Sequence, residues 1–202
     1  MIITSIGLLI TAILTGALSA LLMSGVIGKH RPKLATSIDV QNWQSNWAIG
    51  TQATTPYMRA YIARRGLLAL PKSEAVYFIR AADDEGRALN EACTYMISGD
   101  PQMAKWWSIT LYDAQDFLPL NQDNAYSIDQ TSVGNGNWEI AVQATHPENH
   151  PHWLSSRAAG EFDLMMRLYK PKPALLVDPH KKFKPPSVQR LHCLEKNKGA
   201  GS

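Results

Sequence analysis

The N-terminal 28 residues of this 202-residue chain contain no charged side chain. An apolar run of this length allows one helix to cross the hydrocarbon core of a bilayer, which takes about 20 residues. A cleaved signal peptide would begin with basic residues and carry a shorter apolar core, whereas this run begins Met-Ile-Ile-Thr-Ser. We therefore predict a single transmembrane anchor over residues 1–28, with the rest of the chain folded outside the membrane.

Small side chains recur at every fourth position of this segment. In lipid, helices associate where small residues let two backbones approach closely, because the hydrophobic effect does not press them together. The pattern predicts a packing face for the transmembrane helix of another integral membrane subunit, although small residues are also common in membrane helices generally. The face consists of Ala12, Gly16, Ala20, Ser24 and Gly28.

Two signals disagree about the side of the membrane on which the domain lies. Lys29, Arg31 and Lys33 follow the apolar run, and such a basic flank favours the cytoplasm. The chain also has two cysteines, Cys93 and Cys193, which allow one pairing. A disulfide between them would fit an exported domain and would close a loop of about 100 residues. Two separate buried thiols are the alternative, and they need no particular compartment.

Hydrophobic alternation beyond the anchor predicts mostly strands in one domain. Short runs alternate apolar and polar residues and are separated by Gly, Asn and Pro, which is typical of an antiparallel β-sandwich. One short helix is predicted between Thr55 and Gly66, with Pro56 in its first turn. We predict a juxtamembrane linker over residues 29–42, a sandwich over 43–193 and a tail over 194–202. The predicted strands cover residues 75–81, 92–98, 106–113, 138–144 and 162–169.

Basic residues gather toward the C-terminus. Residues 170–202 hold eight Lys or Arg against two acidic residues, whereas residues 34–169 hold nine against fifteen. A nucleic-acid-binding protein would usually spread its basic residues over a folded face with aromatic residues between them. We therefore expect no nucleic-acid partner. We expect the basic segments to meet anionic lipid headgroups or an acidic partner, with a solvated tail as the alternative.

The order and spacing of several short motifs resemble a bacterial family called domain of unknown function 1214 (DUF1214), in its membrane-anchored, single-domain form. The resemblance implies a jelly-roll-like β-sandwich exported to the periplasm, anchored in the bacterial inner membrane, and it implies no agreed chemistry. The motifs are Trp106–Asp113, Phe117–Asn121, Trp153-Leu154, Gly160–Phe162, Arg167–Pro171 and Pro185-Pro186, preceded by Pro56–Ala60, Gly66–Leu70, Ser73–Ala75 and Tyr77-Phe78.

The segment His146-Pro-Glu148-Asn-His150-Pro-His152 places three imidazoles and a carboxylate within seven residues. Zinc accepts ligands of these kinds, and catalytic zinc sites often use three of them. Two prolines stiffen the segment, and the family pattern does not require these histidines. A polar surface loop is therefore the expected structure, and a metal site with His146, His150 and His152 is the alternative.

A second cluster combines Asp113, Arg167 and Tyr169, which lie at the ends of predicted strands. A buried ion pair between Asp113 and Arg167 that clamps two strands is one interpretation. The other interpretation is a site for a substrate carboxylate or a uronic acid. In that site Arg167 would bind the anion, and Tyr112 or Tyr169 would donate a proton.

Two further features are expected to be structural. The acidic turn Asp83-Asp84-Glu85 lacks the full pattern of a calcium loop, so we interpret it as a solvated turn. Aromatic rings can stack on sugars, but in a sandwich of this size they more often pack the core and its rim. The aromatic set is Tyr95, Trp106, Trp107, Trp138 and Trp153.

The sequence as a whole favours a non-catalytic role without a cofactor. We expect a membrane-anchored periplasmic accessory or interaction subunit of an inner-membrane protein assembly, because no nucleophile–base motif stands out and the anchor carries a packing face. The alternative is a cell-envelope enzyme or binding protein that acts on acidic glycans through the Arg167 cluster.

Overall fold

The computed structural model describes residues 2–23, 37–47, 49, 56–64 and 70–194. The chain divides into two compact units. One unit comprises residues 1–37 and 47–71, and the other comprises residues 38–46 and 72–202. The second unit is a β-sandwich and contains all candidate site residues other than those of the predicted packing face.

The first unit contains the apolar helix α1 (Ile2–Met23) and the short helix α2 (Pro56–Arg64). Within the described residues, α1 is the one helix long and apolar enough to cross a membrane, with a mean hydropathy of 2.1 over Ser5–Leu22. Its 22 residues would extend about 33 Å, close to the thickness of a hydrocarbon core. A signal sequence at the same place would have the same length and composition.

Three hydroxyl groups within α1 are satisfied inside the helix. Thr11 donates to the Gly7 carbonyl at 2.9 Å, Thr15 donates to the Thr11 carbonyl at 2.8 Å, and Ser19 donates to the Gly16 carbonyl at 2.9 Å. Lipid offers no hydrogen-bond partners, so these internal bonds suit a helix surrounded by hydrocarbon. Ala12, Gly16 and Ala20 of the predicted packing face lie on α1, whereas Ser24 and Gly28 are outside the described residues.

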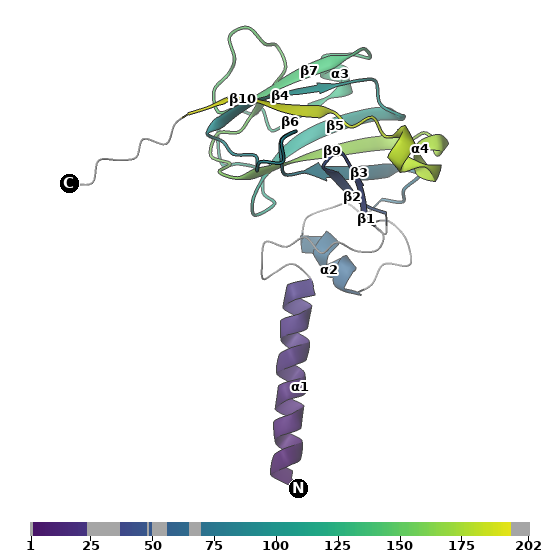
Figure 1. The fold of residues 1–202 in the computed structure, drawn as a ribbon, viewed down its shortest axis with the longest axis vertical. Coiled ribbons are helices and arrows are strands. Elements are labelled where there is room, and N and C mark those ends of the chain that lie inside the picture. The colour runs from purple at the N-terminus through teal and green to yellow at the C-terminus, as the bar shows by residue number, and fades with distance from the viewer. Residues whose placement is uncertain (1, 24–36, 48, 50–55, 65–69, 195–202) are drawn as a thin grey trace, which may run out of the picture. The chain divides into compact units, whose positions relative to one another are not determined.

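The second unit has two sheets, which Figure 1 shows as two layers. The six-stranded sheet has the order β1-β2-β3-β9-β5-β6, and the four-stranded sheet has the order β10-β4-β7-β8. The bounds in the first sheet are β1 Ser37–Val40, β2 Trp43–Asn46, β3 Ala75–Arg80, β5 Ala104–Asp113, β6 Ser127–Asp129 and β9 Phe162–Pro171. Those in the second are β4 Cys93–Gly99, β7 Trp138–Gln143, β8 Trp153–Ser155 and β10 Ser187–Cys193.

The mainly β prediction is confirmed, with one correction to the strand pairing and one to the number of short helices. Strand β8 pairs with β7 in parallel, so the four-stranded sheet is mixed rather than antiparallel. The predicted helix is observed as α2, although Thr55 and Gly66 lie outside the described residues. Three further short helices follow in the sandwich, α3 (Gln130–Val133), α4 (Pro173–Val177) and α5 (Pro179–Lys182).

The core lies between the two sheets and is built from the predicted alternating faces. On β5, Trp107, Ile109 and Leu111 are all buried, as the alternation predicts. Trp107 stacks against Trp138 of β7 with ring centroids 4.4 Å apart, which joins the two layers. Gly99 leaves room for the Trp138 ring, because a Cβ at position 99 would lie 2.2 Å from it. Buried residues of the other predicted faces are Ile140, Val142, Phe162, Leu164, Met166 and Leu168.

The Pro/Lys-rich segment after residue 170 is part of the folded sandwich. Leu175 of α4 is buried, and Phe183 stacks on Phe78 with ring centroids 3.8 Å apart. Strand β10 then pairs with β4. A solvated tail is therefore the wrong interpretation for residues 170–193, since apolar side chains hold this segment to the core. Residues 195–202 lie outside the described part of the chain.

Candidate functional site

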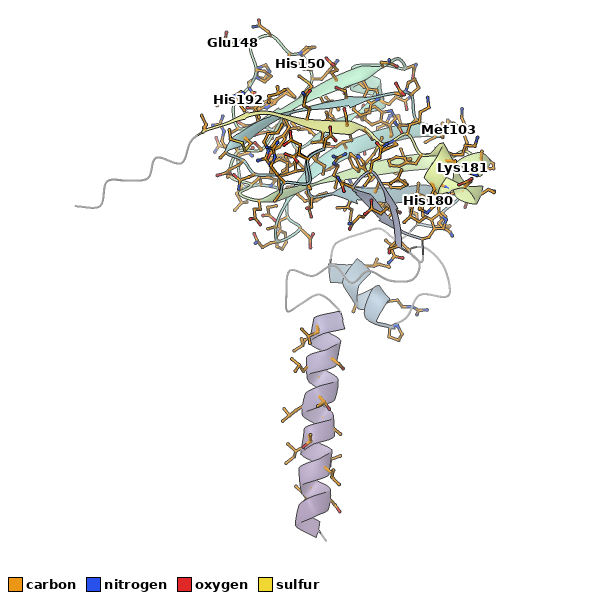
Figure 2. The ribbon with its side chains drawn as sticks, in the orientation of Figure 1. Met103, Glu148, His150, His180, Lys181 and His192 are labelled. Atoms are coloured by element: carbon orange, nitrogen blue, oxygen red, sulfur yellow. A yellow bond between two sulfur atoms is a disulfide. The ribbon has the colours of Figure 1, made fainter. Side chains whose placement is uncertain are left out.

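The three histidines of the predicted metal alternative do not converge on one point. His146 packs edge-on against Trp153 with ring centroids 4.9 Å apart, and Nδ1 of His150 lies 2.9 Å from the carbonyl oxygen of His152. Figure 2 shows Glu148 and His150 on a loop at the edge of the sandwich. Within the described residues, no group of three or more His, Cys, Asp or Glu side chains is arranged to hold a metal ion.

Two of these histidines instead line an open groove of about 660 Å³. His150 and His152 form part of one wall, and Glu139 of β7 also faces the groove. Lys184 and Asp100 lie opposite one another there, with Nζ and Oδ2 3.8 Å apart. The groove is therefore polar and carries both signs of charge, and it has the character of a solvated surface hollow.

Asp113 and Arg167 do not form the ion pair considered from the sequence. The carboxylate of Asp113 accepts hydrogen bonds from the backbone N–H groups of Gln115 and Phe117, both at 2.9 Å. It thus stabilises the turn that follows β5. In the register between β5 and β9, Asp113 lies opposite Phe162, and Arg167 lies opposite Ser108. The two charged residues are therefore well separated along the strands.

Arg167 instead donates to two neutral hydroxyl groups on β5. Its Nη1 donates to the hydroxyl of Thr110 at 2.9 Å, and its Nη2 donates to the hydroxyl of Tyr112 at 2.7 Å. The guanidinium also lies 5.6 Å from the centre of the Tyr112 ring. Thr110 is buried and is further fixed by a 2.9 Å hydrogen bond with Ser127 of β6. These contacts orient the guanidinium, and none of its partners among the described residues carries a negative charge.

An aromatic pair lies on the same face of the sheet, on the side of Arg167 away from the two hydroxyls that its guanidinium reaches. Trp106 of β5 is directly opposite Tyr169 of β9, one same-face position along the strands from the Ser108–Arg167 pair. The two rings are 5.2 Å apart, and the Trp106 indole donates to the Thr131 hydroxyl at 3.0 Å. Both rings are partly exposed, so they are accessible from outside the core. Of the predicted cluster, the structure thus brings Arg167 into contact with Tyr112, whereas Tyr169 packs on Trp106 and Asp113 lies apart.

The charge on Arg167 is an exception within the sandwich. The four other arginines of this unit each have a carboxylate within 4 Å. Arg80 pairs with Asp84 and Arg157 pairs with Asp123, whereas Arg87 and Arg190 both pair with Asp83. Among the described residues, no carboxylate lies within 4.0 Å of Arg167. Because fixed arginine charges are usually compensated in folded proteins, Arg167 is the residue most suited to an external anion.

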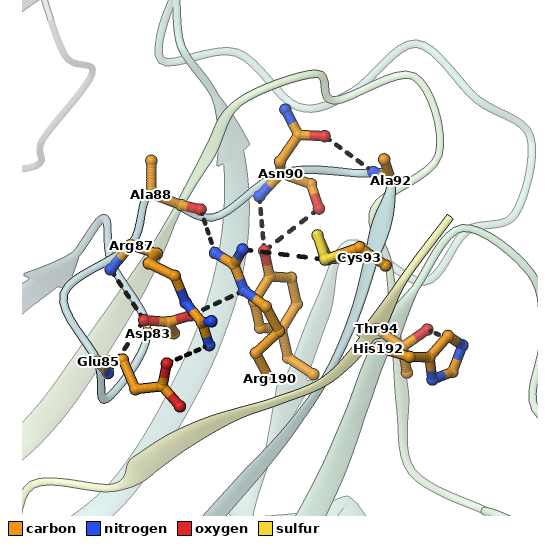
Figure 3. Close-up of a disulfide and its surroundings, with 12 residues drawn as sticks. Asp83, Glu85, Arg87, Ala88, Asn90, Ala92, Cys93, Thr94, Arg190 and His192 are labelled. Atoms are coloured by element: carbon orange, nitrogen blue, oxygen red, sulfur yellow. Dashed lines mark hydrogen bonds and ion pairs between the residues drawn. A yellow bond between two sulfur atoms is a disulfide. The ribbon is translucent and has the colours of Figure 1, made fainter. Parts of the chain in front are cut away.

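In contrast to Arg167, the arginines near the disulfide have carboxylate partners, and Figure 3 shows this region in close-up. Cys93 of β4 and Cys193 of β10 are bonded to each other, so the pairing allowed by the sequence is confirmed. They lie directly opposite one another at the end of the β4–β10 ladder. The bond therefore fastens the last strand of the fold to an early one.

The acidic turn before β4 belongs to the same structure, and the solvated-turn interpretation is wrong for Asp83. This side chain is 1% exposed, and its carboxylate lies 2.8 Å from Nε of Arg190 and 3.0 Å from Nε of Arg87. It also accepts from the backbone N–H groups of Glu85 and Arg87, at 3.0 and 2.9 Å. The turn is buried against β10 because its charge is fully compensated. Glu85, 70% exposed, does lie in solvent.

Two pKa shifts follow from these surroundings. Burial would raise the pKa of the Asp83 carboxyl, but the hydrogen bonds from Arg87 and the charges of Arg190 and Arg87 outweigh it, and the pKa lies below its ordinary value. Burial raises the pKa of the Tyr95 phenol, which hydrogen-bonds with the backbone of Asn90. Arg190 lies over the Tyr95 ring, 5.4 Å from its centre. Asp83 is thus held as an anion and Tyr95 as a neutral phenol.

Sequence reasoning missed two kinds of residue. Thr110 carries no local signal for an arginine-orienting hydroxyl, because its role depends on the register between β5 and β9. The i,i+4 spacing of Asp83 and Arg87 could have suggested one half of the buried ion cluster, but Arg190 is distant in sequence. The predicted aromatic set divides between the core, with Tyr95, Trp107 and Trp138 buried, and the partly exposed pair Trp106 and Trp153.

Comparison with solved structures supports the fold. The chain is similar to the VPA0106 protein from Vibrio parahaemolyticus, with 19% identity and a TM-score of 0.55 over 67% of this chain and 35% of that one. An uncharacterised protein from Burkholderia cenocepacia matches with 13% identity and a TM-score of 0.39, over 58% of this chain and 29% of that one. The chain therefore spans about one third of the length of either protein. No curated protein matches it in sequence.

The family comparison covers the centre of the sandwich. Residues 74–173 match the model of a family described as protein of unknown function (DUF1214). The matched region runs from the start of β3 through β9 and includes Arg167, Tyr112 and Trp106. The resemblance expected from the sequence motifs is thereby confirmed, and residues 74–173 of this chain belong to the DUF1214 family.

Proposed function

We propose that this protein is a membrane-anchored, non-catalytic subunit of a bacterial inner-membrane protein assembly, with its sandwich in the periplasm. The observation that carries the proposal is α1, whose apolar surface is continuous and whose hydroxyls are bonded internally. Such a helix buries its side chains in lipid or against another helix. The proposed partners are other integral membrane subunits that pack along the small-residue face of α1.

The disulfide supports the periplasmic location. Disulfides persist in oxidising compartments and are rare in the reducing cytoplasm, so Cys93–Cys193 favours export over the weaker signal of the basic flank. The lysines of the C-terminal segment are partly engaged with carboxylates, as in the Lys170–Glu74 and Lys184–Asp100 pairs. Lipid headgroups or an acidic partner at this segment are therefore a secondary part of the proposal.

A double substitution tests the role of the helix. A Cβ at Gly16 meets nothing within 4 Å in this chain, so bulk added there acts only on a neighbour. We expect Gly16→Leu/Ala20→Leu to remain in the membrane, because Leu favours insertion, and to lose most of the protein that co-purifies with it from mild detergent. Quantitative mass spectrometry of the tagged full chain, expressed at its native level, measures this loss.

The matched control places the same bulk on the other side of the helix. Gly7 and Thr11 lie roughly opposite Gly16 and Ala20 at about 100° of rotation per residue. Gly7→Leu/Thr11→Leu should keep the co-purifying proteins. Equal recovery from both double variants would remove the helix from the proposed interface, and the anchor would then only tether the sandwich.

A further inference from the structure

Lysines gather in residues 171–184, where β9 continues into α4 and α5, and this segment is here termed the basic corner. It contains four lysines and one acidic residue, Asp178, which caps α5 and lies 3.4 Å from Nζ of Lys181. Figure 2 shows Lys181 at the surface of this corner. Lys172 and Lys182 are exposed, and among the described residues no carboxylate lies within 4.0 Å of either ammonium group. The corner therefore presents uncompensated positive charge to solvent.

Apolar packing holds this corner to the core and leaves one apolar side chain outside. Leu175 of α4 is buried, and Phe183 is buried in its stack on Phe78. Val177, the last residue of α4, is instead 85% exposed. An exposed apolar side chain among lysines suits a lipid surface, because the ammonium groups meet the headgroups while the apolar group enters the boundary beneath them.

The far end of the sandwich has the opposite charge. Strand β5 begins opposite Pro171 and ends at Asp113, so its two ends are about 30 Å apart. The loop that follows, residues 113–124, contains three aspartates and no lysine or arginine, although Asp123 pairs with Arg157. An anionic surface would attract the basic corner and repel this loop, so it would favour one orientation of the sandwich.

The chain also joins the sandwich to the unit of α1 at the end that carries the basic corner. The sandwich resumes at Lys72, just before β3, and the carbonyl of Glu74 accepts from the N–H of Lys170 at 2.8 Å. Strand β2, after which the chain leaves the sandwich, runs antiparallel to β3 with Gln44 opposite Ile79. The end of β2 and the start of β3 therefore both lie at this end of the sheet.

We propose that the basic corner docks on a bilayer surface of anionic phospholipids, with Val177 entering the headgroup region between the lysines. Lysine heads are point charges on flexible stems, which suit a fluid array of lipid phosphates better than a fixed pocket on a protein. The inference rests on the membrane anchor of the proposed function, because a tethered sandwich stays at high local concentration near lipid and weak contacts then suffice.

Spin labels on the full chain in lipid nanodiscs test the docking. A nitroxide is attached through Val177→Cys or, as the matched control, through Leu120→Cys, which is 95% exposed in the far loop. Both native cysteines are in the disulfide, so the label reaches only the introduced thiol. In discs with half phosphatidylglycerol, the label at 177 should be about tenfold less accessible to a neutral, water-soluble nickel chelate than in phosphatidylcholine discs. The label at 120 should be equally accessible in both.

Four results would decide against the proposal. Equal accessibility of the label at 177 in the two lipids overturns it, and so does shielding that persists in about 1 M NaCl, which would mean apolar insertion without charge recognition. Shielding by added poly-L-glutamate but not by phosphatidylglycerol assigns the corner to an acidic protein partner instead. A chain that does not enter the discs contradicts the anchor and this inference with it. A chain that is retained in the disc without docking leaves the proposed role of α1 intact.

Charge variants assign the docking to the corner, with the label kept at position 177. Lys182→Gln should lower the ratio of docked to undocked chains about fivefold, the effect of one lysine near an anionic surface. The matched control is Arg157→Gln, which removes the same charge at the far end, where the Asn121 side chain donates to the Arg157 carbonyl at 2.7 Å. It should change the ratio less than about twofold, because its charge lies more than a Debye length from the lipid. Equal losses in the two variants, or unchanged docking in Lys182→Gln, would contradict the assignment.

Discussion

Arg190 and Arg167 make similar contacts with a tyrosine ring but have opposite electrostatic surroundings. Each projects from a strand of the sandwich and lies over a tyrosine ring, at 5.4 Å for Arg190 over Tyr95 and 5.6 Å for Arg167 over Tyr112. Arg190 pairs with the buried carboxylate of Asp83 at 2.8 Å, whereas Arg167 has only hydroxyl partners among the described residues.

The difference separates a structural charge from an available one. Around Arg190 the fold supplies a buried counter-ion, Asp83, whose carboxylate also accepts two backbone N–H bonds, so removing either charged partner leaves the other uncompensated. Around Arg167 the described residues supply orientation without neutralisation. The first region should therefore respond to substitution with a large loss of stability, and the second with a small one.

The largest expected effect is the loss of the disulfide. Replacing both Cys93 and Cys193 with alanine should lower the free energy of unfolding by about 4 kcal/mol, because the bond closes a long loop in the unfolded chain. Urea unfolding in detergent, followed by tryptophan fluorescence, measures this change against the oxidised wild type. Wild-type protein treated with a reductant should show a similar loss. A change below about 1 kcal/mol would mean that the β4–β10 ladder holds this end without the bond.

The next largest effect should come from Asp83→Asn. Loss of the buried carboxylate leaves Arg190 and Arg87 facing a neutral amide, at an expected cost of about 3 kcal/mol. The matched control is Glu85→Gln, which removes a 70% exposed carboxylate from the same Arg87 and should cost less than about 1 kcal/mol. Equal costs would show that burial does not distinguish the two carboxylates.

Acid pH provides a second measurement of the same residue. The folded-state pKa of Asp83 is lowered, so its stabilisation is complete above its unfolded-state pKa of about 3.9 and is lost as the pH falls through the folded value. The stability of Asp83→Asn should therefore decline less steeply below about pH 4 than that of the wild type. Parallel declines would contradict the cause assigned to the shift.

The strands that could be predicted are those long enough to show alternation. The strands β3, β4, β5, β7 and β9 all lie within a residue or two of the predicted ranges, because their apolar faces repeat over six to ten residues. Strands β1, β2, β6 and β8 have three or four residues, too few for a period to emerge from loop sequence. The parallel pairing of β8 depends on where the 144–152 connection returns the chain, which no local pattern encodes.

The candidate site could be predicted in its residue types but not in its contacts. The sequence groups Arg167 with Tyr112 and Tyr169 by their chemistry, but it also places Asp113 beside Arg167. In the observed register, the positions opposite Arg167 and opposite Phe162 lie five residues apart on β5, about 17 Å along the strand. Register follows from how two apolar faces interlock, and it cannot be read from either strand alone.

The smallest expected effect is that of Arg167→Met, which is measured against the same substitution at Arg190. Arg190→Met leaves the buried Asp83 with one cation fewer and should cost about 2–3 kcal/mol of unfolding free energy. Arg167→Met removes two hydrogen bonds to hydroxyls, but Thr110 keeps its bond to Ser127 and the partly exposed Tyr112 can bond to water, so the cost should stay within about 1 kcal/mol. Urea unfolding of both variants in the same detergent measures the difference. If Arg167→Met costs as much as Arg190→Met, then the fold depends on the charge at position 167 as much as on that of Arg190, and the contrast between the two arginines fails.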